Sequence, residues 1–261
     1  MLAAGAVAGV LAGLLGIGGG IVIVPVLSLV LEYLGVDGSI RMHVAVGTSL
    51  ATIIPTSLSS TRAHLARDGV DVSLARAWAL YVLVGSALGV WLAAQMHSAS
   101  LSLVFASVAF LIGVKLLLPI DDKRLADRVP DGVLIKTVPT TIGAVSSMMG
   151  IGGGTLTVAA LTLLNHPIHR AVGTAALFGL AISLPGAIGF VIAGWGDPRL
   201  PAASAGFVSL PGLALIAPMT VLTAPLGAAL AHRLSERTLS ALFGVFLLAT
   251  AVRMALEGLA G

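Results

Sequence analysis

The residues best suited to chemistry in this sequence are glycines that occur in two dense clusters. The pentapeptide GIGGG stands at residues 16–20 and again at residues 150–154, each time inside a long apolar run. Glycine permits positive φ angles and close approach, so consecutive backbone N–H groups at the start of a helix can point at an anion. We expect an anion site formed by the backbone of Gly18, Gly19, Gly20, Gly152, Gly153 and Gly154.

Hydroxyl groups near the glycine clusters could complete such a site, because a buried anion needs hydrogen-bond donors. The stretch HVAVGT at residues 43–48 returns as HRAVGT at residues 169–174, which favours the shared threonine as a ligand in both halves. Thr52 and Thr157 are explained equally well by bonds to their own helices. The hydroxyl candidates are Thr48, Ser49, Thr155 and Thr174.

Two histidines and one arginine are the titratable or charged candidates. His43 and His169 each stand five residues before the shared threonine, and histidine could donate to an oxyanion or carry a proton. The alternative is that both lie in solvated surface loops or cap the next helix. Arg170 could attract anions, or it could be a loop arginine that only sets the topology.

The composition is that of an integral membrane protein. Hydrophobic residues make up 57% of the chain, charged residues make up 10%, and the mean hydropathy is +1.07, whereas soluble domains carry about a quarter charged residues. The apolar runs are too continuous for a β-barrel and indicate helices of about 20 residues. We expect eight hydrophobic segments, at residues 2–31, 44–61, 77–96, 101–119, 134–164, 171–195, 206–231 and 238–257.

Three matches in the same order divide the chain into two homologous halves. Besides GIGGG and AVGT, the stretch from Leu88 to Leu118 parallels the stretch from Leu226 to Leu256. Such repeats are typical of secondary transporters, and paired glycine-interrupted segments point to their binding sites. We expect an all-α polytopic membrane protein with repeat 1 at residues 1–119, a cytoplasmic linker at residues 120–133 and repeat 2 at residues 134–261.

The first and fifth segments are too long for one straight span, and two structures could explain the glycines. Each segment could be one helix broken at GIGGG, or a re-entrant hairpin of two half-helices. Eight full crossings place ten of the 14 Lys and Arg residues on one face, whereas hairpins place eleven there and leave Arg41, Arg199 and Arg253 opposite. The positive-inside rule therefore favours hairpins and inverted repeats. Both structures put the linker in the cytoplasm.

The doubled, ordered set of GIGGG and AVGT motifs resembles the TauE/SafE sulfite exporter family, also called the toluene sulfonate uptake permease family, over essentially the whole chain. The resemblance implies a polytopic transporter of the bacterial inner membrane that moves sulfite, thiosulfate or organosulfonates such as sulfoacetate. It fixes neither the substrate nor the direction of transport. One departure is that IVIVPVL follows the first GIGGG and TLTVAAL follows the second, so the proline of the first half has no counterpart.

Other classes of protein fit the sequence less well. Cysteine is absent and neither an HExxH nor a GxxxxGK[ST] motif occurs, so we expect no enzyme, no metal centre, no cofactor and no ATP-driven pump. No acidic residue sits in mid-span, which argues against a cation pathway. An anion channel is the main alternative, and a divalent metal permease is a weaker one. The expected partners are the sulfur anion and the bilayer, with no nucleic acid and a homodimer as an open option.

Overall fold

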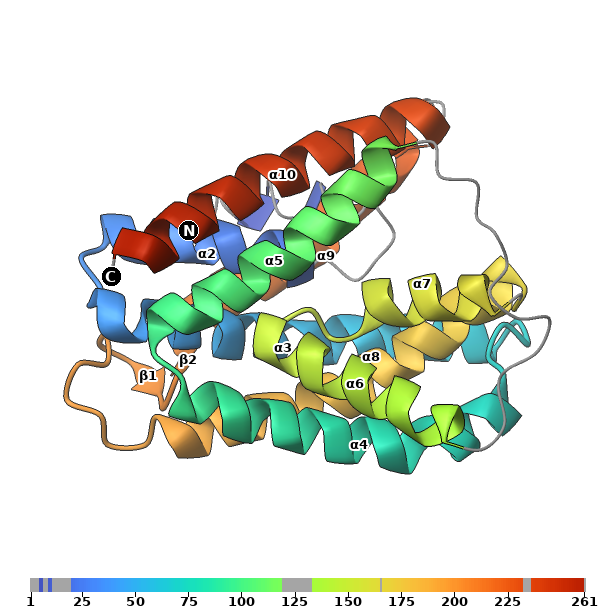
Figure 1. Cartoon of the computed structure of the whole chain (residues 1–261), viewed down its shortest axis with the longest axis horizontal. Coiled ribbons are helices and arrows are strands. Elements are labelled where there is room, and N and C mark those ends of the chain that lie inside the picture. The colour runs from blue at the N-terminus through green and yellow to red at the C-terminus, as the bar shows by residue number, and fades with distance from the viewer. Residues whose placement is uncertain are drawn as a thin grey trace.

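The computed structural model describes residues 5–6, 9–10, 20–118, 133–164, 166–231 and 236–260, and most of them are helical (Figure 1). The predicted linker at residues 120–133 falls outside this description except for Val133. A short antiparallel pair of strands, β1 (Ser204–Ala205) and β2 (Val208–Ser209), lies between residues 193 and 210. The helices are α2 (Gly20–Tyr33), α3 (Gly38–Leu65), α4 (Val72–Gln95), α5 (Ser98–Leu117), α6 (Leu134–Met149), α7 (Gly154–Leu163), α8 (Ile168–Ala193), α9 (Leu210–Ala231) and α10 (Glu236–Ala260).

Four helices in the described part of the chain are long and apolar enough to cross a membrane. They comprise residues Val72–Gln95, Ser98–Leu117, Arg170–Ala193 and Ser240–Leu259, and shorter apolar helices occur at Gly20–Tyr33, Gly154–Leu163 and Leu210–Thr223. The 28-residue helix α3 is not among them, because its middle turns carry hydroxyl residues, which it buries against other helices. An interior helix faces protein rather than lipid and so tolerates polar residues. The fold is that of a predominantly helical membrane protein.

The second GIGGG separates two helices that run in opposite directions. α6 ends at Met149, and Gly150, Gly152 and Gly153 have φ angles of +69°, +66° and +78°, a region that strongly favours glycine. α7 begins at Gly154 and runs back toward the end of the molecule where α6 started (Figure 1). The predicted segment 134–164 is therefore a helical hairpin rather than one long broken helix.

Helices α3 and α8 form an antiparallel pair at the centre of the molecule (Figure 1). An added Cβ at Gly186 would lie 2.8 Å from Leu50, and one at Gly179 would lie 2.6 Å from the Ser57 hydroxyl, so small residues let the two helices approach closely. α4 packs on both α6 and α8, whereas α2 and α9 pack on α3. This packing surrounds the middle of α3 with other helices.

Helices α5 and α10, which the sequence predicts to be equivalent in the two halves, pack along each other (Figure 1). Ion pairs tie α10 to the rest of the molecule. Arg41 of α3 lies 3.1 Å from the Glu257 carboxylate, and Arg253 lies 2.5 Å from the Glu32 carboxylate of α2. These contacts gather the last turn of α2, the first turn of α3 and the last turns of α10.

The long axis of the molecule has two ends that hold different helix termini (Figure 1). The Arg41 end, on the left of the figure, holds the end of α2, the start of α3, the β1–β2 loop and the end of α10. The Arg170 end, on the right, holds the end of α3, the start of α6, the end of α7 and the start of α8. α2 and α7 therefore leave the interior toward opposite ends.

Candidate anion-binding site

Parts of the two GIGGG motifs meet in the interior of the molecule. Gly20, at the start of α2, is buried, and a Cβ added to it would lie 2.5 Å from the carbonyl oxygen of Gly150 and 2.7 Å from Cα of Ile151. A larger residue at position 20 would displace this closely packed backbone. Ile53 of α3 packs against both Gly20 and Gly152. Gly18 and Gly19 lie outside the described residues.

The start of α7 presents backbone N–H groups to this junction. Gly153 is the N-cap of α7, and no side chain in the described part of the chain caps the helix. Within the described ranges, no acceptor is found for the N–H groups of Gly154, Thr155 or Leu156, as expected for the first turn of an uncapped helix. Gly152 and Gly153 are buried. A buried helix N-terminus of this kind favours a negative charge.

Buried hydroxyl groups beside the turn lack hydrogen-bond partners among the described residues. Ser146 of α6 is fully buried, and its Oγ lies 3.7 Å from where a Cβ on Gly153 would be. Thr155 and Thr157, in the first turn of α7, are buried and also lack partners. Ser183 of α8 is a fourth buried hydroxyl without such a partner, and its neighbour Ile182 packs against Gly153. Because buried hydroxyls are normally hydrogen-bonded, these four groups are available to a ligand.

Ser49 positions the turn rather than offering a free donor. Its hydroxyl donates to the carbonyl oxygen of Gly150 at 2.7 Å and so joins α3 to the end of α6. The Thr52 hydroxyl donates to the Ser49 carbonyl of its own helix at 2.7 Å, which is the structural role that the sequence already offered for it. Both side chains are buried next to the junction of the GIGGG motifs.

Thr48 and Thr174 lie far from each other and accept backbone hydrogen bonds from loops. The Thr48 hydroxyl accepts the N–H of Ser209, and the Thr174 hydroxyl accepts the N–H of Asp71, both at 2.9 Å. Gly47, next to Thr48, packs against Phe190 of α8, and Gly173, next to Thr174, packs against His64 of α3. The two threonines are therefore about 14 residues, or about 20 Å, apart along the antiparallel pair. The structure does not bring them together around one small ligand.

His43 lies inside α3 and is buried. It is not in a solvated surface loop, which was the alternative expectation from the sequence. Its Nε2 lies 3.0 Å from the carbonyl oxygen of Ala93, near the end of α4. Since a carbonyl only accepts, Nε2 carries the proton in this contact. Its ring packs against Phe190 and Phe207. His43 stands ten residues before Ile53 in α3, about 15 Å from the junction of the GIGGG motifs.

His169 and Arg170 belong to the first turn of α8, at the Arg170 end of the molecule. The backbone of His169 is helical, while its side chain lies outside the description. Arg170 is exposed and stands nine residues before Gly179, which is about 14 Å along the helix. The positions of both residues in α8 therefore keep them away from the junction of the GIGGG motifs.

The loops at the two ends carry the charged pairs. At the Arg41 end, hydrogen bonds from the Arg199 guanidinium and backbone lower the pKa of the Asp197 carboxyl to about 2. At the Arg170 end, burial raises the pKa of Asp71, but hydrogen bonds from the N–H of Leu74 and the Ser73 hydroxyl outweigh it and leave that pKa lowered. His166 lies 3.5 Å from the Asp71 carboxylate. These charges lie outside the membrane-spanning helices.

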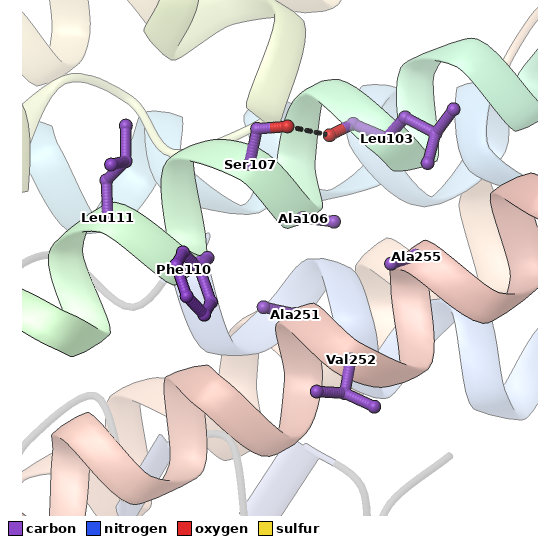
Figure 2. Close-up of a pocket in the computed structure, with 8 residues that line it drawn as sticks. All are labelled: Leu103, Ala106, Ser107, Phe110, Leu111, Ala251, Val252 and Ala255. Atoms are coloured by element: carbon purple, nitrogen blue, oxygen red, sulfur yellow. Dashed lines mark hydrogen bonds between the residues drawn. The ribbon is translucent and has the colours of Figure 1, made fainter.

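A groove of about 410 Å³ runs between α5 and α10 (Figure 2), and no residue of a GIGGG motif lines it. Its one hydroxyl, that of Ser107, donates to the Leu103 carbonyl of the same helix at 2.8 Å. The groove is therefore apolar and offers an anion no donor. Its lining residues are Leu103, Ala106, Ser107, Phe110, Leu111, Ala251, Val252 and Ala255. Elsewhere in the described ranges, no group of three or more His, Asp or Glu side chains could hold a metal ion.

Sequence reasoning missed three serines of the interior. Ser57 and Ser183 are separated by 126 residues, the same spacing as the two AVGT motifs, so extending the repeat alignment by nine residues would have found them. Ser57 lies beside Gly179, whose added Cβ would be 3.1 Å from the Gly152 carbonyl oxygen. Ser146 gave no such signal, because its counterpart at the GIGGG spacing is Ala12.

The fold and the comparisons define a membrane transporter of many helices. The family model "Sulfite exporter TauE/SafE" matches residues 1–254, and the chain belongs to this family. The resemblance read from the doubled motifs is thereby confirmed.

Relatives from bacteria and an archaeon are similar over almost their whole length. A probable membrane transporter protein of Haemophilus influenzae is 32% identical over 98% of this chain and 97% of its own. The probable membrane transporter protein YunE of Bacillus subtilis is 28% identical over 98% and 96%. A probable membrane transporter protein of Methanocaldococcus jannaschii is 24% identical over 94% and 92%. No solved structure matches this chain.

Proposed function

We propose that this chain is a secondary transporter that carries a small sulfur oxyanion or sulfonate across the inner membrane by alternating access. The observation that carries the proposal is the start of α7. Three features lie together there among the described residues: N–H groups without a side-chain cap, the buried Ser146 hydroxyl without a partner, and the contact between Gly20 and Gly150. Non-helical backbone at membrane depth is tolerated where it lines a site, and half-helix N-termini commonly hold the anionic groups of transported substrates.

Inverted repeats are part of this proposal, because they would let the two halves exchange roles during alternating access. Equivalent residues make equivalent contacts at opposite ends. Thr48 binds the loop between α8 and α9, and Thr174 binds the loop between α3 and α4. α2 and α7 leave the interior toward opposite ends (Figure 1). Both observations support a two-fold relation within the membrane plane.

The test is sulfite counterflow by the purified chain in proteoliposomes. A carrier gives saturable uptake that sulfite inside the vesicles accelerates, whereas a channel gives flux without counterflow. Ser146→Ala removes one donor to the anion and should weaken apparent affinity about tenfold or more, since hydrogen bonds to charged groups contribute about 1.5–3 kcal/mol. Ser107→Ala is the matched control, because its hydroxyl bonds its own helix in the apolar groove. Equal transport by all three proteins would contradict the proposed site.

A further inference from the structure

The groove between α5 and α10 has no part in the proposed anion site (Figure 2). Ala106 and Ala251 form its buried floor, whereas Phe110, Leu111 and Val252 on its rim are each at least half exposed. Both helices are long and apolar enough to cross a membrane, and 33% of each span is buried inside the protein. The groove therefore opens to the hydrocarbon of the bilayer, where an apolar chain is the material that can fill it.

The shape of the groove suits a flexible chain better than the helix of a second protein. Ala106 and Ala255 point toward each other across the gap between the helices, and Phe110 extends from α5 toward α10 (Figure 2). Helices in membranes associate where small residues let their backbones approach closely, and the large side chains of the rim keep another helix away from the alanines. The groove volume of about 410 Å³ accommodates about 14 methylene groups, each about as large as a water molecule at about 30 Å³.

A lysine continues one edge of the groove toward the membrane surface. Four residues of α5 follow one another at intervals of four and so lie along one face of the helix. They are Leu103, Ser107, Leu111 and Lys115. The first three line the groove, and Lys115 is exposed in the last turn of α5, toward the Arg170 end (Figure 1). Lys115 also takes part in another contact of the chain, but an ammonium group has three donors and can hold a phosphate as well.

The distance from Lys115 to the far end of the groove matches the depth of one leaflet. Leu103 stands 12 residues before Lys115, which is about 18 Å along the helix. The hydrocarbon core of a bilayer is about 30 Å thick, so the acyl chains of one leaflet reach about 15 Å. A lipid whose headgroup lies beside Lys115 can therefore place one acyl chain along the groove. The positive charge favours an anionic headgroup, because Lys near the membrane surface attracts anionic lipids.

We propose that the groove between α5 and α10 binds one acyl chain of an anionic phospholipid, whose headgroup phosphate lies beside Lys115. This inference goes beyond the proposed function, because it rests on two membrane-spanning helices and not on the anion site at the start of α7. The lipid contacts both helices at once, so its binding should raise the melting temperature of the folded chain.

The experiment measures lipid binding to the purified full chain in detergent by native mass spectrometry. Dioleoyl phosphatidylglycerol and dioleoyl phosphatidylcholine have the same acyl chains and differ in the net charge of the headgroup. Phosphatidylglycerol should bind with an apparent dissociation constant about fivefold or more below that of phosphatidylcholine, which is the effect expected of one Lys near the membrane surface. Lys115→Gln should remove this difference, whereas Lys136→Gln, an exposed change in α6 at the same end, should leave it.

Substitutions that fill the groove test the position of the acyl chain. Ser107→Phe adds a ring from the exposed rim of α5, and Ala255→Leu adds a side chain from α10. Each should weaken the binding of both lipids about tenfold or more, because the acyl chain cannot share closely packed space with the new side chain. Leu80→Phe, on the exposed face of α4, is the matched control and should leave binding unchanged. The melting temperature of each variant without lipid checks that it folds.

Three results would overturn this assignment of the groove. Equal binding of phosphatidylglycerol by Ser107→Phe, Ala255→Leu and the unsubstituted chain would mean that the lipid lies elsewhere. Equal binding of the two lipids by the unsubstituted chain would mean that Lys115 does not select an anionic headgroup. A dimer that either groove-filling variant converts to a monomer would mean that a second copy of the chain covers the groove.

Discussion

Thr48 and Thr174 each hold a loop through one hydrogen bond. Both side chains are fully buried, and their hydroxyl oxygens accept the N–H groups of Ser209 and Asp71. A buried polar group that loses its partner costs about 1–3 kcal/mol. We expect Thr48→Val and Thr174→Val each to lower the free energy of unfolding by about 1–3 kcal/mol, measured by thermal or denaturant unfolding in detergent.

The matched control for these substitutions is Thr137→Val. Its side chain is exposed and bonds the Val133 carbonyl of the preceding turn, so the change should stay within about 0.5 kcal/mol. The opposite pattern, in which Thr48→Val keeps normal stability and loses anion binding, would return this threonine to the list of ligands.

Asp197, which lies at the Arg41 end, should make the free energy of unfolding depend on pH. Its pKa of about 2 lies below the ordinary 3.8 because Arg199 donates to the carboxylate. The ionised side chain therefore favours the folded state above the ordinary pKa, and this contribution is lost as the pH falls through the folded pKa. We expect Asp197→Asn to melt below the unsubstituted protein at about pH 6, with the difference closing between about pH 4 and about pH 2. A difference in melting temperature that is constant across this range would contradict the assignment.

At the residue scale, the sequence could predict where the backbone breaks but not which hydroxyls face the break. Gly150, Gly152 and Gly153 do adopt positive φ angles, because few other residues can. The repeated threonines, Thr48 and Thr174, hold loops instead. A residue that recurs in both halves can make either a packing contact or a ligand contact, so repetition does not tell the two apart. Ser146 stands directly before Ser147 and has no hydroxyl counterpart in the first half. Only the packing of α6 against Gly153 shows that it faces the break.

Helices α3 and α10 are joined by the pair between Arg41 and Glu257. The two side chains are 16% and 24% exposed, so the pair lies between the exposed and the buried case. We expect Arg41→Gln and Glu257→Gln each to lower the free energy of unfolding by about 1–2 kcal/mol. The double variant should lose less than the sum, with a coupling of about 0.5–2 kcal/mol measured by a double-mutant cycle.

An exposed arginine at the other end of the same helix provides the control for this cycle. Arg237→Gln lies in the first turn of α10, and surface substitutions usually change stability by less than about 0.5 kcal/mol. Strictly additive losses in the cycle would mean that α10 is held by its apolar contacts with α5 and not by the ion pair.

At the element scale, the sequence located the break in segment 134–164, and only the distribution of Lys and Arg favoured a hairpin over a broken helix. The direction of the chain after Gly153 is set by tertiary packing, since α7 packs against α8 and returns to the Arg170 end (Figure 1). The predicted segment 44–61 falls within α3, but α3 is not among the helices apolar enough to count as a span in the described part of the chain, because the hydroxyls that it buries lower its apolar character. Both features depend on contacts between elements, which local patterns do not encode.

The whole molecule separates its positive charges between its two ends. Arg41, Arg199 and Arg253 belong to segments at the Arg41 end, in the first turn of α3, the loop after α8 and the last turns of α10. The other described Lys and Arg residues belong to the helix termini and loops of the opposite end (Figure 1). They are Arg62, Arg67, Arg76, Lys115, Lys136, Arg170 and Arg237. Because cytoplasmic loops carry the excess of Lys and Arg, the Arg170 end should be cytoplasmic.

Single cysteines can test this orientation, since the chain contains no cysteine of its own. Tyr33→Cys and Trp195→Cys change exposed residues at the Arg41 end, and Ala66→Cys and Val133→Cys change exposed residues at the Arg170 end. A membrane-impermeant maleimide should label the first two in intact cells and the last two only after permeabilisation.

Trp195 decides between the two structures of the glycine-interrupted segments. Two hairpins put it on the same side as Tyr33, because each half then crosses the bilayer three times, whereas eight full crossings would put it on the side of Val133. Labelling of Trp195→Cys only after permeabilisation would therefore overturn the inverted repeat.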